Sequence, residues 1–110
     1  MAYDEGLAQR LRTELADREG LSEKKMFGGL AFMVHGNMCV GVTGQDMLAR
    51  VSPDRFDEVV GRPGARPFAM GGRTMAGWVV VDGARIADPE TLTAWVAEAE
   101  QFVQTLPPKK

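Results

Sequence analysis

The sequence predicts an α+β domain of two layers, in which helices pack on an antiparallel sheet. Apolar residues recur at helical spacing near both ends of the chain, in residues 4–17 and 88–106. Between these segments the apolar residues follow a period of two and are interrupted by glycine-rich turns, which is typical of strands. At 110 residues the chain has room for one domain. We therefore expect residues 1–110 to form a single domain, in the order helix, three strands, short helix, two strands, long helix.

The N-terminal segment is predicted to form an amphipathic helix within residues 4–17. Leu7, Leu11 and Leu15 lie four residues apart and share one face, while charged residues occupy the other. Asp4 is suited to the N-cap, and Gly20 follows as a stop signal.

Three strands are expected next, over residues 30–35, 38–43 and 47–51. Gly36 and Asn37 separate the first two strands. A glycine at the first central position of a two-residue loop favours a type II′ turn, so we expect a tight hairpin here.

The predicted turn fixes the pairing of the hairpin. It pairs His35 with Met38 and Val34 with Cys39. Partners across a ladder share a face, and neighbours along a strand alternate. His35 and Cys39 are therefore expected on opposite sides of the sheet.

A short helix and two strands are predicted in the second half of the chain. Ser52 is a suitable N-cap, Pro53 fits the first helical position, and Gly61 ends the helix. A glycine-rich loop follows, with a short edge strand over residues 67–69 and a longer strand over residues 75–82.

The last helix has the clearest signals. Asp88 is the predicted N-cap, Pro89 occupies the first helical position, and Glu90 favours the positive end of the helix dipole. Apolar residues repeat along one face: Leu92, Trp95, Val96, Ala99, Phe102, Val103 and Leu106. Two consecutive prolines then stop the helix.

Composition narrows the class of protein. The chain has 13 basic and 15 acidic residues and a net charge of −2, which disfavours a dedicated nucleic-acid binder. Cys39 is the single cysteine, so an internal disulfide is impossible and a reducing compartment is favoured. The N-terminus has no signal-peptide pattern, and no apolar stretch is long enough to span a membrane. We expect a soluble cytoplasmic protein.

His35 and Cys39 are the candidates for catalysis, as the one histidine and the one cysteine of the chain. A nucleophile and its base need to share a face within hydrogen-bonding distance, which the predicted hairpin prevents. Free cysteine is most often a small buried hydrophobe, and too few ligands are present for a zinc site. We therefore predict no catalytic residue, metal or cofactor. A small enzyme or ligand-binding protein that uses either residue is retained as an alternative.

Arg62, Arg66 and Arg73 lie in one glycine-rich region and are the candidates for an anion patch. Glycines let backbone amides approach a phosphate, so the region would suit a nucleic-acid contact. The competing interpretation, which we favour, is a solvated connector whose charges keep it soluble.

Both faces of the predicted hairpin are apolar, whereas a sheet with one solvated face alternates apolar and polar residues. Helices of a two-layer domain cover one face, so the second face needs a cover. Methionines suit an adaptable contact surface. The predicted partner surface comprises Met33, His35, Met38, Val40 and Met47, for a protein partner or a second copy of the chain. The alternative is that helices or loops of the chain itself cover both faces.

Two stretches resemble the TfoX N-terminal-domain family. The first is the run from Lys25 to Phe32 (KMFGGLAF), continued by Gly-Asn-Met at residues 36–38, and the second is GRTMAGW at residues 72–78. Asp88-Pro89-Glu90 and Trp95 in the last helix also fit the family. The resemblance covers nearly the whole chain, and we identify the chain as a single-domain member.

The resemblance implies helices on an antiparallel sheet, similar to the two-layer folds of secretion chaperones. The founding members, TfoX or Sxy, regulate natural competence, are thought to act as coactivators with the cyclic-AMP receptor protein, and carry a second, C-terminal helical domain. The family supplies no catalytic residues. The combined expectation is a non-enzymatic protein-interaction module of the regulatory, competence type, with a nucleic-acid-associated protein as the alternative.

Overall fold

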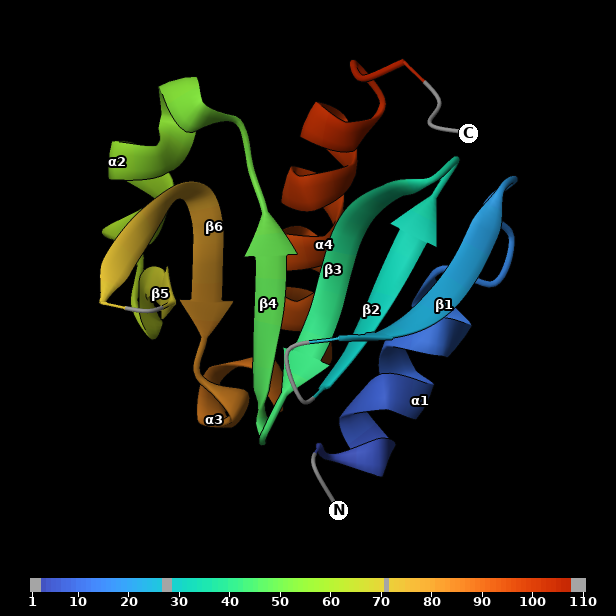
Figure 1. Cartoon of the computed structure of the whole chain (residues 1–110). Helices are drawn as coiled ribbons and strands as arrows, with labels where there is room; N and C mark the ends of the chain where they lie inside the picture. The colour runs from blue at the N-terminus through green and yellow to red at the C-terminus, as the bar shows by residue number, and fades with distance from the viewer. Residues whose placement is uncertain (1–2, 27–28, 71, 108–110) are drawn as a thin grey trace.

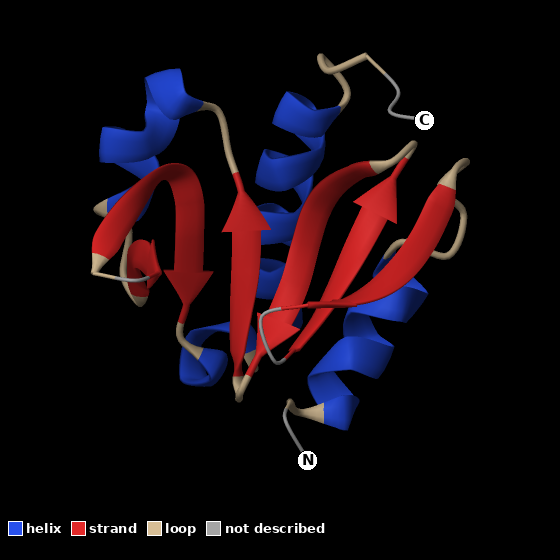
Figure 2. Ribbon diagram, viewed as in Figure 1, coloured by secondary structure: helices blue, strands red, loops and turns tan. Residues whose placement is uncertain are grey.

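The computed structural model describes residues 3–26, 29–70 and 72–107, and describes residues 26, 70, 73, 75 and 76 by their backbone only. The chain forms helices and one antiparallel sheet, which confirms the predicted α+β class (Figures 1 and 2). The helices are α1 (Glu5–Glu14), η1 (Pro53–Arg55, a 3-10 helix), α2 (Phe56–Val60), α3 (Gly83–Ile86) and α4 (Pro89–Val103). The strands are β1 (Leu21–Met26), β2 (Gly29–Val34), β3 (Asn37–Thr43), β4 (Asp46–Arg50), β5 (Ala65–Met70) and β6 (Arg73–Val81).

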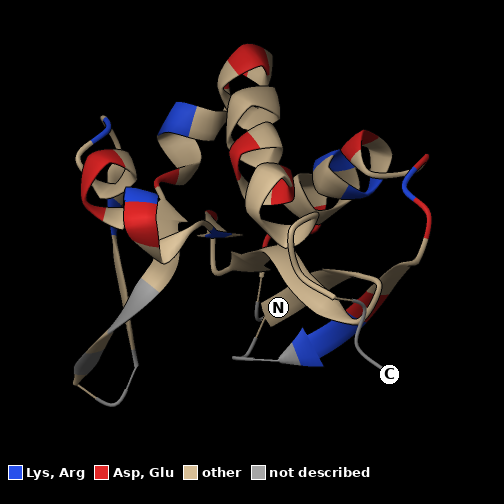
Figure 3. Ribbon diagram, turned by 90° about the horizontal axis from the view of Figure 1, so that it is seen from above, with Lys and Arg blue, Asp and Glu red and all other residues tan. Residues whose placement is uncertain are grey.

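The strands form one sheet in the order β1-β2-β3-β4-β6-β5, with all neighbouring strands antiparallel. The helices lie on one side of this sheet, and the strands form the layer beneath them (Figure 3). The strand at one margin is β1 and the strand at the other is β5. Because the helices share a side, the two faces of the sheet have different surroundings.

Both long helices begin where the sequence predicts. The Asp4 carboxylate accepts a hydrogen bond from the Leu7 amide at 3.1 Å, and the Asp88 carboxylate accepts one from the Thr91 amide at 3.1 Å. Each cap satisfies an amide that has no partner within its helix. α1 ends at Glu14, three residues before the predicted limit.

Two elements were not predicted. β1 reads Leu-Ser-Glu-Lys-Lys-Met, and its polar residues conceal the period of two; charged residues of this kind are common on edge strands. α3 lies between the end of the last predicted strand and the cap at Asp88, where no helix was predicted, and its amide at Ala84 donates to the Asp82 carboxylate at 3.1 Å. The sheet therefore has six strands instead of five.

The turn between β2 and β3 lies one residue earlier than predicted. Val34 pairs with Asn37, so His35 and Gly36 are the central residues of the turn. Both have positive φ, 51° for His35 and 82° for Gly36, which is the signature of a type I′ turn and not of type II′. The predicted pairing of His35 with Met38 was therefore wrong.

A β-bulge in β3 also changes which of its side chains point to each side of the sheet. Met33 pairs with Met38, whereas Phe32 pairs with Val40, so Cys39 is an extra residue in its strand. As a result Cys39 and Val40 both face the helices.

The main core lies between the sheet and the helices. α1 contributes Leu7, Leu11 and Leu15, while α4 buries one face from Leu92 to Val103. On the sheet the largest fully buried side chain is Phe32. Full burial of each such side chain stabilises the fold by roughly 1.5–3 kcal/mol.

No helix in residues 3–26, 29–70 and 72–107 combines the length and apolar character that crossing a membrane requires.

Candidate functional site

The face of the sheet opposite the helices carries a second apolar cluster. We call it the helix-free face. Its buried centre consists of Ala31, Met38, Leu48 and Val80, and partly buried Met33, Phe68 and Trp78 pack against this centre. These residues come from β2, β3, β4, β5 and β6, so the cluster extends across most of the sheet.

Charged residues border this cluster, and the strand register places them on the same face. Lys24 pairs with Ala31, Arg50 pairs with Trp78, and Arg66 pairs with Val80. Partners across an antiparallel ladder share a face, so Lys24 and Arg66 belong to the helix-free face. The side chain of Arg50, at the end of β4, instead reaches Phe102 of α4 on the helix side of the sheet. Asp46 lies on this face by alternation with Leu48.

Arg50 has an unusual environment for a cation. Its guanidinium carbon lies 5.3 Å from the ring centre of Trp78 and 5.4 Å from that of Phe102. A guanidinium over an aromatic ring is attracted by the negative face of the ring. Within the described part of the chain, no carboxylate lies within ion-pair distance of Arg50 or Lys24.

The five residues of the predicted partner surface do not lie together. Met33 and Met38 belong to the helix-free face. Val40 and Met47 are fully buried in the core beneath the helices, because the bulge at Cys39 and the shifted turn reverse their assignment. His35 is an exposed turn residue.

His35 and Cys39 are kept apart, as the sequence predicts, although by a different turn. The His35 amide donates to the carbonyl of Gly20 at 3.0 Å, and its imidazole lies against that glycine. Cys39 is fully buried, and burial raises the pKa of its thiol to about 12. A thiol with such a pKa carries almost no thiolate at neutral pH, so this pair does not form an activated nucleophile.

The three arginines of the predicted anion patch have separate environments. Arg66 pairs with Asp46 at 2.8 Å, and Arg62 pairs with Glu98 at 3.2 Å and with Glu58 at 3.7 Å. Arg73 begins β6, and its side chain lies outside the described part of the structure. The two described arginines are therefore already bound to carboxylates of the chain.

Glu98 joins α4 to the segment that contains η1 and α2. Its side chain is 8% exposed and accepts two hydrogen bonds from Arg55, at 2.8 and 3.1 Å, in addition to the Arg62 contact. The hydrogen bond from Arg55, with the positive charges of Arg55 and Arg62, lowers the pKa of Glu98 despite its burial. Glu98 is thus held as a carboxylate.

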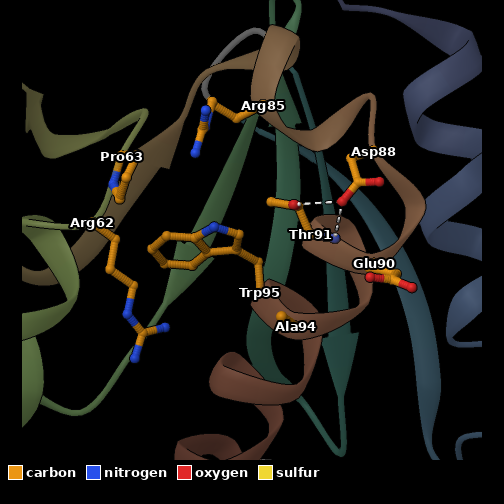
Figure 4. Close-up of a pocket in the computed structure, with 8 residues that line it drawn as sticks. All are labelled: Arg62, Pro63, Arg85, Asp88, Glu90, Thr91, Ala94 and Trp95. Carbon is orange, nitrogen blue, oxygen red and sulfur yellow. Dashed lines mark hydrogen bonds between the residues drawn. The ribbon is translucent and has the colours of Figure 1, made fainter.

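A pocket of about 320 Å³ lies beside this network (Figure 4). Trp95 lies between Arg62 and Arg85, and the guanidinium carbon of Arg62 is 5.6 Å from its ring centre. Asp88 is occupied as the α4 cap, since it accepts from both the amide and the hydroxyl of Thr91. These contacts fasten the segment after α2 to α4.

Sequence reasoning did not single out Lys24 or Arg50. The face of Lys24 depends on β1, which was not predicted, and the face of Arg50 depends on pairing between β4 and β6.

Comparison with known protein families gives a match. Residues 13–103 match the family described as the TfoX N-terminal domain, which is most of the chain. Neither a curated protein nor a solved structure shows significant similarity to the chain.

Proposed function

The chain belongs to the TfoX N-terminal-domain family, and from this premise we propose that it is a non-enzymatic protein-interaction module with a regulatory, competence-type role. We further propose that its contact surface is the helix-free face and that its partner is another protein or a second copy of the chain. The cytoplasm is its proposed compartment, since its one cysteine provides no disulfide.

One observation carries the proposal. The helices are gathered on one side of the sheet, yet the opposite face has its own apolar cluster (Figure 3). Met33 and Trp78 are only partly buried at its margin. Partly exposed methionine and tryptophan are well suited to a contact surface, because both supply large apolar area and adapt to a partner.

The two alternatives have weaker support. The enzyme alternative needs an activated residue, whereas Cys39 is buried with a raised pKa and His35 lies in a turn away from it. The nucleic-acid alternative relied on three arginines, of which Arg62 and Arg66 form ion pairs within the chain.

The proposal is tested by Met33→Glu. A carboxylate at the margin of the apolar cluster opposes burial of this face against a partner, so capture of partners from a cytoplasmic extract is expected to be lost. Ala97→Glu is the matched control, because it adds the same charge on the exposed side of α4.

Circular dichroism of both variants establishes that they are folded, and light scattering separates self-association from binding to another protein. If folded Met33→Glu retains the same partners and the same oligomeric state as Ala97→Glu, the proposal is wrong.

A further inference from the structure

We infer that the pocket between α3, α4 and the segment after α2 binds a small organic carboxylate. The carboxylate would accept hydrogen bonds from the Arg85 guanidinium and from the indole N–H of Trp95, and the apolar part of the ligand would lie against Pro63 and Ala94. Trp95 belongs to the main core, so this pocket is on the helix side of the sheet. The inference therefore goes beyond the proposed function and does not depend on the helix-free face.

The first observation is an unpaired donor on Trp95. Its side chain is 4% exposed, yet among the described residues no acceptor is hydrogen-bonded to its indole N–H. Trp95 lines the pocket, and the edge of its ring that carries the nitrogen faces Arg85 (Figure 4). A tryptophan N–H in a buried side chain usually has a hydrogen-bond partner. An acceptor bound in this pocket would supply one.

The second observation is a cation beside this donor. Within the described part of the chain, the Arg85 side chain forms no ion pair or hydrogen bond. Its methylene stem packs on the backbone of Gly64, where an added Cβ would lie 2.1 Å from the Arg85 Cγ. Gly64 thus leaves room for Arg85 to extend toward Trp95 (Figure 4). A guanidinium offers a planar pair of donors, which a carboxylate matches with two hydrogen bonds.

The other charged groups that line the pocket restrict the ligand. Arg62 is paired with Glu98 at 3.2 Å, so its charge is already compensated. Asp88 accepts from both the amide and the hydroxyl of Thr91, and Glu90 is exposed. Because these two carboxylates line the same pocket, they repel a phosphate dianion more strongly than a ligand with one negative charge. The pocket therefore suits a monoanionic carboxylate.

The experiment titrates the folded full chain with benzoate at constant ionic strength and follows the indole N–H signals of its two tryptophans by heteronuclear NMR. Trp78→Phe assigns the signals. The Trp95 signal should shift to saturation with a Kd on the order of millimolar, as expected for so small a ligand. Inorganic phosphate should bind more weakly than benzoate. Benzyl alcohol, which has a similar shape without the charge, should also bind more weakly.

Arg85→Gln should weaken benzoate binding about tenfold or more, because it removes charge-assisted hydrogen bonds. Lys24→Gln is the matched control, since it removes one positive charge from an exposed residue on β1 and should leave the affinity unchanged. Glu90→Gln should bind benzoate about twofold more tightly, because it removes a like charge from the pocket. Circular dichroism establishes that each variant is folded.

Four results would each overturn the inference: no saturable shift of the Trp95 signal, equal affinity of Arg85→Gln and Lys24→Gln, tighter binding of phosphate than of benzoate, or equal binding of benzyl alcohol and benzoate. Met33→Glu should bind benzoate as the unmodified chain does, because Met33 lies on the helix-free face. Failure of the carboxylate site and failure of the proposed function are therefore distinguishable.

Discussion

At the scale of single residues, Glu98 has the most demanding environment among the described charged groups. It is nearly buried, and two arginines from a different part of the chain provide its hydrogen bonds and compensating charge. A buried carboxylate is tolerated only when its oxygens are bound in this way. Glu98 therefore determines how η1 and α2 are attached to α4.

Glu98→Gln is expected to lower the free energy of unfolding by about 1–3 kcal/mol, because it removes charge-assisted hydrogen bonds in a mostly buried site. Urea denaturation measures this change. Glu58→Gln is the control, since Glu58 pairs with the same two arginines but its side chain is 64% exposed. Glu58→Gln should change stability by less than about 0.5 kcal/mol. Equal effects of the two variants would show that the contacts of Glu98 stabilise the fold no more than those of exposed Glu58.

The contribution of Glu98 should also depend on pH. Its pKa in the folded state lies below the ordinary value of 4.5, chiefly through the hydrogen bond from Arg55. The stabilisation is thus complete above that ordinary pKa and is lost as the pH falls through the lower, folded pKa. The stability difference between the unmodified chain and Glu98→Gln should shrink on acidification below pH 4.5. A difference that stays constant would show that the pKa is not lowered.

At the scale of elements, the β2–β3 hairpin depends on a turn with positive φ at two successive residues. Gly36 adopts φ 82° without a Cβ penalty, whereas His35 at φ 51° carries one. Two long-range contacts hold the turn. The His35 amide donates to Gly20, and the Asn37 side chain donates to the Pro107 carbonyl at 2.9 Å.

Gly36→Ala should destabilise the domain by about 1–2 kcal/mol, because alanine is strained in the left-handed region. His35→Asn should leave stability within about 0.5 kcal/mol, because asparagine suits the first central position of a type I′ turn. Thermal unfolding of both variants provides the measurement. A Gly36→Ala variant as stable as the unmodified chain would rule out the type I′ assignment.

The same hairpin shows what the sequence predicts and what it does not. Caps are local signals, so Asp4 and Asp88 placed the starts of α1 and α4 correctly. The turn was displaced by one residue because Gly36 fits a central position of either turn. The contacts that decide between them reach Gly20 and Pro107, which no short window of sequence contains. The predicted partner surface inherited that error: Met33 and Met38 share the helix-free face, whereas Val40 and Met47 lie in the main core beneath the helices.

At the scale of the whole molecule, the protection of backbone amides against hydrogen exchange should decrease from the middle of the sheet to its margins. β3 and β4 pair on both sides and face the main core, whereas β1 and β5 each pair on one side. Amides of β3 and β4 should therefore exchange with solvent on the order of tenfold or more slowly than the hydrogen-bonded amides of β1 and β5. Hydrogen exchange followed by NMR tests this. Equal protection of β1 and β3 would show that the margin is covered, for example by a bound partner.

The extra residue in β3 has a consequence for how this sequence tolerates insertions and deletions. Met38 and Val40 face opposite sides of the sheet although an even number of positions separates them, because Cys39 shifts the phase of the strand. Deleting Cys39 alone would restore strict alternation along β3. The side chains on one side of the deletion would then exchange faces, so residues that now pack in the core would point away from it. We therefore expect the domain to remain folded after an insertion or deletion in β3 only when a second length change, in the opposite strand or the turn, restores the register.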